Sequence, residues 1–265
     1  MTRILTLRSN HMKKSLKLCF LLMMALFFLT ACASGQKNVK KQQAEAIRNL
    51  GEAYMAQDAY TMALREFLKA ESIYANDPYL QDDLGVAYMA KGSMDNAVAH
   101  FKKALKINPK YSPARNNLGS AYMEMEKWEE AIECFNLVKA DLLYGTPHYP
   151  LTNLGFVYYK LKDYDQAVKN YQEAIDVAPN FPMAFHGLGL VYMAMGKNSD
   201  AVAALQSAVE KAPKEGPIYM DLGKAYQQSG EYNKAYDAFN KAAELAKDAK
   251  SKTEALDAAK KVWTH

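Results

Sequence analysis

The sequence predicts an all-α protein built as a solenoid of six helix pairs, with a capping helix at its C-terminal end. Three observations lead to this prediction. A Leu-Gly-x-x-Tyr motif recurs through the chain at steps of 34, 34, 36, 34 and 34 residues, beginning at Leu50, Leu84, Leu118, Leu154, Leu188 and Leu222. A second apolar pattern at helical spacing follows each motif, and prolines close several of these segments.

The repeat at residues 78–111 shows how each pair is expected to form. Leu84, Gly85 and Tyr88 share one face of a first helix, and Gly92 marks the turn after it. A second amphipathic segment follows, and Pro109 ends it because proline cannot continue a helix. Each repeat therefore predicts a helix, a tight turn and a second helix.

The second helix of every repeat carries a small residue, a bulky residue four positions later and a further apolar residue, usually small, three positions after that. The first small residues are Ala63, Ala97, Ala131, Ala167, Ala201 and Ala235. The bulky residues are Phe67, Phe101, Phe135, Tyr171, Leu205 and Phe239, and the last set is Ala70, Ala104, Val138, Ala174, Ala208 and Ala242. Small residues let two helices approach closely and the bulky ring fills the groove between them, so we expect core and no functional site here.

This period and pattern resemble the tetratricopeptide repeat family. The resemblance covers residues 44–249 and implies a right-handed superhelical solenoid of six repeats at 44–77, 78–111, 112–145, 148–181, 182–215 and 216–249. The step of 36 places two extra residues between the third and fourth repeats, where we expect a lengthened turn and a local change in pitch. Residues 250–265, and within them Lys252 to Val262, are expected to form the cap that covers the last apolar face.

The N-terminus is predicted to be a signal peptide over residues 1–31. An apolar run from Leu16 to Thr30 follows several basic residues, and it is shorter than the roughly 20 residues of a bilayer span. Met12 precedes two lysines and is the more usual kind of start than Met1.

The sequence Leu-Thr-Ala-Cys at residues 29–32 is similar to the lipobox of bacterial lipoproteins. That resemblance implies cleavage before Cys32 and a diacylglycerol on its thiol, with further acylation such as palmitate on the new amine. The covalent lipid would be a membrane anchor with no spanning helix. Ala33 after the cysteine resembles outer-membrane sorting, so we expect an outer-membrane location facing the periplasm. Residues 32–43 are expected to be the lipidated N-terminus and a short tether.

Charge and cysteine usage agree with export. The formal net charge of +4 depends on five basic residues before Cys32, and beyond them 28 basic residues face 29 acidic ones. A nearly neutral array gives no electrostatic reason to expect nucleic acid. After processing and lipidation only Cys134 would remain as a thiol, and we expect it to be an inert core residue.

Certain repeat positions line the groove of tetratricopeptide repeat proteins. Carried over to this chain, they predict a partner-binding surface on the concave side, which the first helices line. The candidate residues are Val86, Met89, Asn117, Met123, Asn153, Phe156, Tyr159, Leu190 and Met193. Methionine is flexible and polarisable, which suits irregular apolar partners. The alternative is that these side chains pack between neighbouring helices.

The asparagines of this set resemble an asparagine ladder that holds an extended backbone, although Asn is also the usual residue at that position. A clamp for a C-terminal carboxylate would use basic residues such as Arg48. Glu52, Asp82 and Asp83 would repel such a ligand, so we expect no clamp.

No pattern in the sequence indicates an enzyme. The five histidines lack partners at metal-ligand or nucleophile spacing, adjacent acids diverge on a helix, and no phosphate-binding glycine loop is present. We therefore expect no catalytic residue, no metal, no cofactor beyond the lipid on Cys32, and no small-molecule substrate.

Six repeats behind a lipobox resemble the type IV pilus biogenesis and stability lipoproteins, the PilF/PilW/Tgl group. The resemblance implies a pilotin that binds a pilus secretin and assists its localisation and assembly at the outer membrane. The alternative is a general envelope adaptor that recruits peptidoglycan enzymes or proteases.

Overall fold

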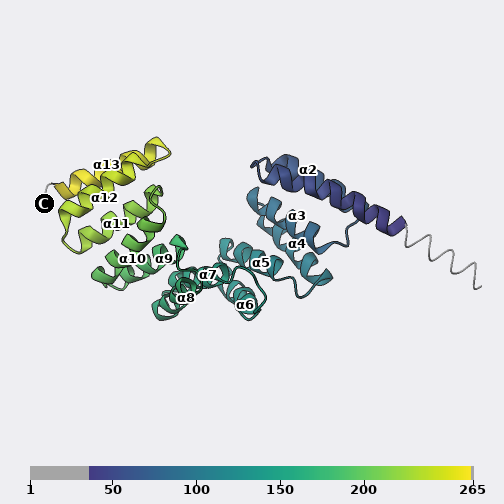
Figure 1. Ribbon diagram of the computed structural model, residues 1–265, viewed down its shortest axis with the longest axis horizontal. Helices are drawn as coiled ribbons and strands as arrows, with labels where there is room; N and C mark the ends of the chain where they lie inside the picture. Colours follow the sequence, from purple (N-terminus) through teal and green to yellow (C-terminus); the bar gives the residue numbers. More distant parts are fainter. Residues whose placement is uncertain (1–35, 264–265) are drawn as a thin grey trace, which may run out of the picture. The chain divides into compact units, whose positions relative to one another are not determined.

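The computed structural model describes residues 36–263, and these residues form helices joined by short connections, with no β-strand among them (Figure 1). The first helix spans residues 36–55. The others are α2 (Tyr60–Ile73), α3 (Pro78–Ala90), α4 (Met94–Ile107), α5 (Ser112–Glu124), α6 (Trp128–Lys139), α7 (His148–Lys160), α8 (Tyr164–Val177), α9 (Pro182–Ala194), α10 (Asn198–Lys211), α11 (Gly216–Gln228), α12 (Tyr232–Glu244) and α13 (Ala249–Trp263). The predicted all-α class is confirmed.

The chain consists of two compact units, and the boundary between them lies between Ser93 and Met94. The first contains the helix at 36–55, α2 and α3, and its core gathers Ala44, Phe67, Leu80 and Leu84. A Cβ atom added to Gly51 would lie 2.4 Å from the ring of Phe67, so only glycine allows this approach of the first helix to α2.

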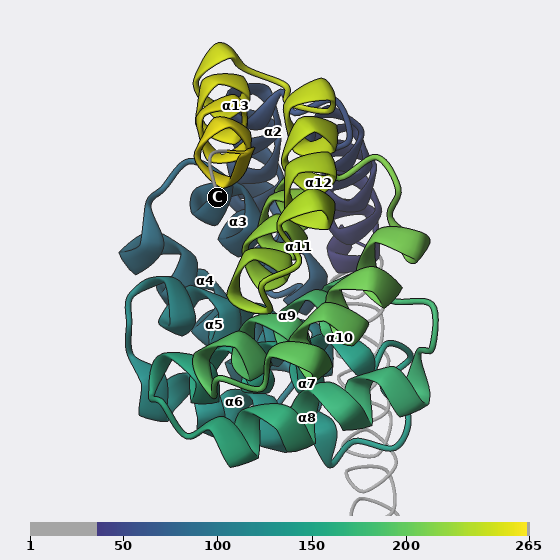
Figure 2. The ribbon, with the colours of Figure 1, turned by 90° about the vertical axis from the view of Figure 1, so that its left-hand side faces the viewer.

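In the second unit consecutive helices pack as the pairs α5–α6, α7–α8, α9–α10 and α11–α12. The first helices of these pairs, α5, α7, α9 and α11, also contact one another in sequence along the unit (Figure 2). Close pairing depends on the motif glycine. A Cβ on Gly119 would lie 2.7 Å from Phe135, and one on Gly223 would lie 2.5 Å from Phe239. The prediction that small residues and a bulky ring bring the helices together is confirmed, with the motif glycine as the small residue of the first helix.

The three sets of small and bulky residues predicted as core are buried in every repeat, with a relative exposure of at most 5%. Their spacing of four and three keeps them on one face of each second helix, towards its partner. None of them is available as a functional group.

The connection between α6 and α7 covers residues 140–147, whereas residues 108–111, 178–181 and 212–215 suffice for the corresponding connections elsewhere. The predicted lengthening of this turn is confirmed. The loop carries Leu142 and Leu143, whose side chains are 96% and 93% exposed.

The C-terminal helix α13 packs on α12, and Figure 1 shows the two side by side with α11. Its buried residues Ala255, Ala259 and Val262 lie against the last repeat, where Ala259 and Val262 join the core that includes Phe239. The helix therefore covers the face that a further repeat would otherwise bury.

The N-terminal segment differs from the expectation in part. Residues 36–43 continue the first helix, although a tether was predicted over 32–43. Six of these eight residues are glutamine or lysine, which are good helix formers, and Ala44, which is 3% exposed, fixes the helix to the core directly after them. The predicted signal peptide and Cys32 lie outside the described residues. Among the residues that are described, no helix combines the length and the apolar character needed to cross a bilayer.

Candidate functional site

Seven of the nine predicted groove residues lie on three neighbouring helices of the second unit. They are Asn117 and Met123 on α5, Asn153, Phe156 and Tyr159 on α7, and Leu190 and Met193 on α9. Because α7 contacts both α5 and α9, the structure brings these helices into one surface. We call these seven residues the groove strip.

No member of the groove strip is sealed in the core. Phe156 is 37% exposed and the others are half-buried. Tyr159 packs against the core that contains Tyr171, and Met193 packs against the core that contains Leu222. Each of these two side chains thus supports the solenoid with one part and reaches the surface with another.

Val86 and Met89 lie on α3, in the first unit, and both are half-buried. Each shows a partly accessible apolar side chain of the kind found in the groove strip.

The exposed ring of Phe156 has a cation beside it. Lys160 follows one turn later on α7, and its Nζ atom lies 5.3 Å from the centre of the ring. A lysine over an aromatic face is held by a cation–π interaction, so this part of the surface combines an apolar ring with a fixed positive charge. Such a pair can receive an apolar side chain that has a carboxylate near it.

A charged cluster bridges α9 and α11, and the sequence analysis did not find it. His186 Nε2 lies 2.9 Å from Asp221 Oδ2, and Lys224 Nζ donates to Asp221 Oδ1 at 2.8 Å. Burial alone would raise the pKa of Asp221, but the hydrogen bonds from His186 and Lys224 outweigh it and the pKa lies below its usual value. His186 and Asp221 are 35 residues apart, about one repeat, but neither belongs to the recurring motif, so the sequence pattern does not indicate their contact.

A second cluster lies in the first unit around Arg48. Its guanidinium is paired with Glu52 at 3.1 Å, Asp77 at 3.3 Å and Asp83 at 3.4 Å. Asp77 also accepts a hydrogen bond from Tyr79 N and thereby caps α3. Arg48 is therefore paired with three acidic side chains within the first unit.

Asp83 is the member of this cluster whose pKa is raised most strongly. Burial and the neighbouring charge of Glu52 raise its pKa, Arg48 opposes the rise, and the pKa reaches about 8. Its Oδ2 atom is buried and accepts no hydrogen bond. The carboxylate therefore lies where its charge is disfavoured.

Cys134 is buried on α6, and burial raises the pKa of its thiol to about 11. A thiol in this state is a poor nucleophile at neutral pH. Between residues 36 and 263, no three His, Cys, Asp or Glu side chains converge in a way that could hold a metal ion.

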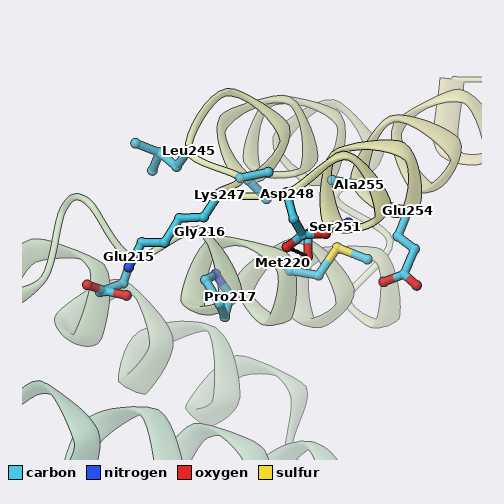
Figure 3. Close-up of a pocket in the computed structure, with 12 residues that line it drawn as sticks. Glu215, Gly216, Pro217, Met220, Leu245, Lys247, Asp248, Ser251, Glu254 and Ala255 are labelled. Carbon is cyan, nitrogen blue, oxygen red and sulfur yellow. Dashed lines mark hydrogen bonds between the residues drawn. The ribbon is translucent and has the colours of Figure 1, made fainter. Parts of the chain in front are cut away.

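A cavity of about 270 Å³ lies between α11, α12 and the start of α13, with Met220, Pro217 and Ala255 among its lining residues (Figure 3). Asp248 accepts hydrogen bonds from Ser251 N at 2.9 Å and Ser251 Oγ at 2.7 Å, and so caps α13. No predicted groove residue lines this cavity. Asp248 and Ser251, which line it, serve the helix terminus.

Two protein-family models match parts of the chain. The model described as "Tetratricopeptide repeat" matches residues 88–142 and 192–260, and the model described as "TPR repeat" matches residues 155–196. Together they cover more than half of the chain. The chain belongs to the tetratricopeptide repeat family. A comparison with curated proteins finds no match.

Solved structures share the fold. The crystal structure of PilW, described as a widely conserved type IV pilus biogenesis factor, matches with a TM-score of 0.75 and 20% identity, over 81% of this chain and 99% of PilW. Pseudomonas aeruginosa PilF matches with a TM-score of 0.70 and 17% identity, over 82% of this chain and 98% of PilF. YrrB, described as a TPR protein with an unusual peptide-binding site, matches with a TM-score of 0.52 and 20% identity, over 72% of this chain and 97% of YrrB. These likenesses confirm the repeat solenoid.

Proposed function

We propose that this protein is a lipid-anchored scaffold of the bacterial outer membrane that binds a protein partner through the groove strip. The partner is a type IV pilus secretin, and the protein acts as a pilotin that assists secretin localisation and assembly. The observation that carries the proposal is the row of partly exposed apolar side chains on α5, α7 and α9. The function is binding and delivery, with no bond made or broken.

The chemistry of the groove strip supports a polypeptide as ligand. Methionine and aromatic side chains offer apolar contact that tolerates irregular shapes, and Asn117 and Asn153 carry amides that can both donate and accept. The likeness to PilW, a type IV pilus biogenesis factor, supports the assignment to pilus assembly.

The lipid anchor rests on the sequence at residues 29–32 and on the apolar run before it. Two or more acyl chains hold a protein stably on a membrane, whereas one chain gives only reversible binding. A di- or triacylated Cys32 would thus anchor the protein to the membrane, and the groove strip would bind the partner protein.

The test is affinity capture of secretin from envelope extracts with the acylated protein as bait. The variant Met123→Glu plus Phe156→Glu places two charges in the groove strip. We expect secretin recovery to fall by at least about tenfold, because each charge must be desolvated against an apolar partner.

The matched control is Leu137→Glu plus Val177→Glu, which adds the same charge at exposed apolar sites on the second helices α6 and α8. This control should bind like wild type, and circular dichroism should show all three proteins folded. Equal recovery by the groove variant would exclude the groove strip as the site. Absence of secretin with wild type would exclude the pilotin function, and recovery of cell-wall hydrolases instead would favour an envelope adaptor.

A further inference from the structure

The loop at residues 140–147 projects two leucines into solvent. Leu142 is 96% and Leu143 is 93% exposed, which makes them the two most exposed of the large apolar residues among the described positions. Scattered apolar residues are common on protein surfaces, but two adjacent and almost fully exposed leucines on a loop that is twice the length of its counterparts are not explained by packing.

Hydrogen bonds to Asp141 stabilise the conformation of this loop. The carboxylate of Asp141 accepts from Leu143 N at 3.0 Å and from the hydroxyl of Ser112 on α5. Its carbonyl oxygen accepts from Tyr144 N at 3.1 Å. The side chains of Leu142 and Leu143 are therefore presented outward by a braced turn.

The loop carries one charged side chain, that of Asp141, which must stay at the aqueous surface when the leucines enter an apolar phase. Asp141 is the one ionisable acid or base among residues 140–147, apart from the phenol of Tyr144, and its charge is already hydrogen-bonded. These bonds, from Ser112 first and then from Leu143 N, lower the pKa of Asp141. Burial lowers the pKa of His148, which follows the loop, so its imidazole is neutral at pH 7.

Tyr149 follows the loop in the sequence and contacts a second aromatic ring. Tyr149, on the first turn of α7, is 46% exposed, and its ring meets Phe181 edge-on with 5.5 Å between the centroids. Tyrosine is enriched where proteins meet the boundary between lipid headgroups and acyl chains. Cavities of the second unit lie between α8, α9 and α10 and between α11, α12 and α13, and neither leucine lines these.

We propose that the loop at residues 140–147 is a membrane-surface contact, in which Leu142 and Leu143 enter the headgroup–acyl boundary of a bilayer. Leu142 and Leu143 project outward from the loop, and a bilayer can bury both side chains because its acyl chains adapt to their shape. The inference rests on the proposed function in one respect, since an acylated Cys32 would keep a bilayer within reach and turn loop insertion into an intramolecular event.

The test places an environment-sensitive nitrobenzoxadiazole dye on the full acylated chain carrying Leu143→Cys, bound to vesicles of phosphatidylethanolamine and phosphatidylglycerol. Cys134 is buried with a pKa of about 11, and the acylated Cys32 has no thiol, so the dye goes to position 143. We expect nitroxide lipids labelled near the headgroups to quench the dye. The additional change Leu142→Ser should lower the ratio of inserted to free loop by about tenfold or more, because it removes one large apolar side chain from the inserted surface.

The control change is Leu161→Ser, since Leu161 is 42% exposed and follows the other end of α7, about 20 Å along the helix. Quenching should be unchanged by this control. Absence of quenching, or equal quenching with Leu142→Ser, overturns the proposal, and so does an equal loss with Leu161→Ser. If Leu142→Ser instead abolishes capture of a protein without any lipid quenching, the loop is a protein contact and the proposal is again wrong.

Flotation of the vesicles separates this inference from the anchor. A chain that floats without quenching keeps the anchor and refutes the loop contact. A chain that fails to float, while excess vesicles still quench the dye, refutes the anchor and retains the loop contact.

Discussion

Asp83 occupies a position that holds asparagine in three other repeats, at Asn49, Asn117 and Asn153. An amide there carries no charge, whereas Asp83 is half-buried near Glu52 with its Oδ2 atom out of contact with solvent, and its pKa rises from 3.8 to about 8. The ion pair with Arg48 at 3.4 Å compensates only in part. A single residue thus links the stability of the first unit to pH.

The direction of this link follows from the raised pKa. The unfolded chain releases the Asp83 proton near pH 4 and the folded chain releases it near pH 8. The proton bound by Asp83 therefore contributes its full stabilisation of the folded state below about pH 4. This contribution is lost as the pH rises through about 8. We predict that Asp83→Asn, which does not titrate, gains at least about 1 kcal/mol in unfolding free energy relative to wild type between pH 4 and pH 8, the equivalent of less than one pKa unit.

Urea unfolding followed by circular dichroism at several pH values measures this difference. Asp237→Asn, at an exposed site on α12, is the matched control and should show no such trend. A pH-independent difference for Asp83→Asn, or one that favours wild type increasingly at high pH, would mean that the Arg48 pair dominates.

At the scale of the elements, the turn between the two helices of each repeat has a fixed backbone conformation. Gly92, Gly196 and Gly230 adopt φ values of 74°, 70° and 77°, and Asp58, Glu126 and Lys162 adopt 56°, 56° and 61° at the equivalent positions. The left-handed region costs a residue with a Cβ about 1–2 kcal/mol, so half of the turns are strained. Glycine at the end of a helix removes this cost.

We predict that Glu126→Gly stabilises the chain by about 0.5–1 kcal/mol, because relief of backbone strain exceeds the added entropy of the unfolded glycine. The midpoint of urea unfolding should rise. Glu133→Gly, in the exposed face of α6, provides the opposite control and should cost about 1 kcal/mol. A lower midpoint for Glu126→Gly would show that its side chain stabilises the turn more than its φ angle destabilises it.

At the scale of the molecule, the repeat determines how much can be predicted from the sequence. Each core position, such as Ala131 or Phe135, has five counterparts at steps of 34 or 36 residues, so burial of one face follows from periodicity alone. The helix boundaries follow for the same reason, because prolines and glycines recur at the junctions. The predicted capping helix also forms, since the last repeat has an apolar face to cover.

What periodicity does not reveal is the contact between residues that differ from repeat to repeat. Arg48 meets Asp83, and His186 meets Asp221, only because neighbouring first helices present these particular pairs. The exposure of Phe156 and its contact with Lys160 likewise depend on how these two side chains are directed on α7. The polar composition of residues 36–43 predicts a tether, whereas the structure shows a helix there, because most of these residues favour a helix and Ala44 anchors it.

The account depends most on the claim that the surface formed by α5, α7 and α9 binds the partner directly. Photo-crosslinking in cells tests it, with a benzophenone amino acid at Phe156 in the groove strip and, as a control, at Val177, an exposed apolar site on α8. We predict an adduct with a type IV pilus secretin from position 156 and none from position 177. A secretin adduct from position 177 alone, or no secretin adduct from position 156 in cells that assemble pili, would contradict the account.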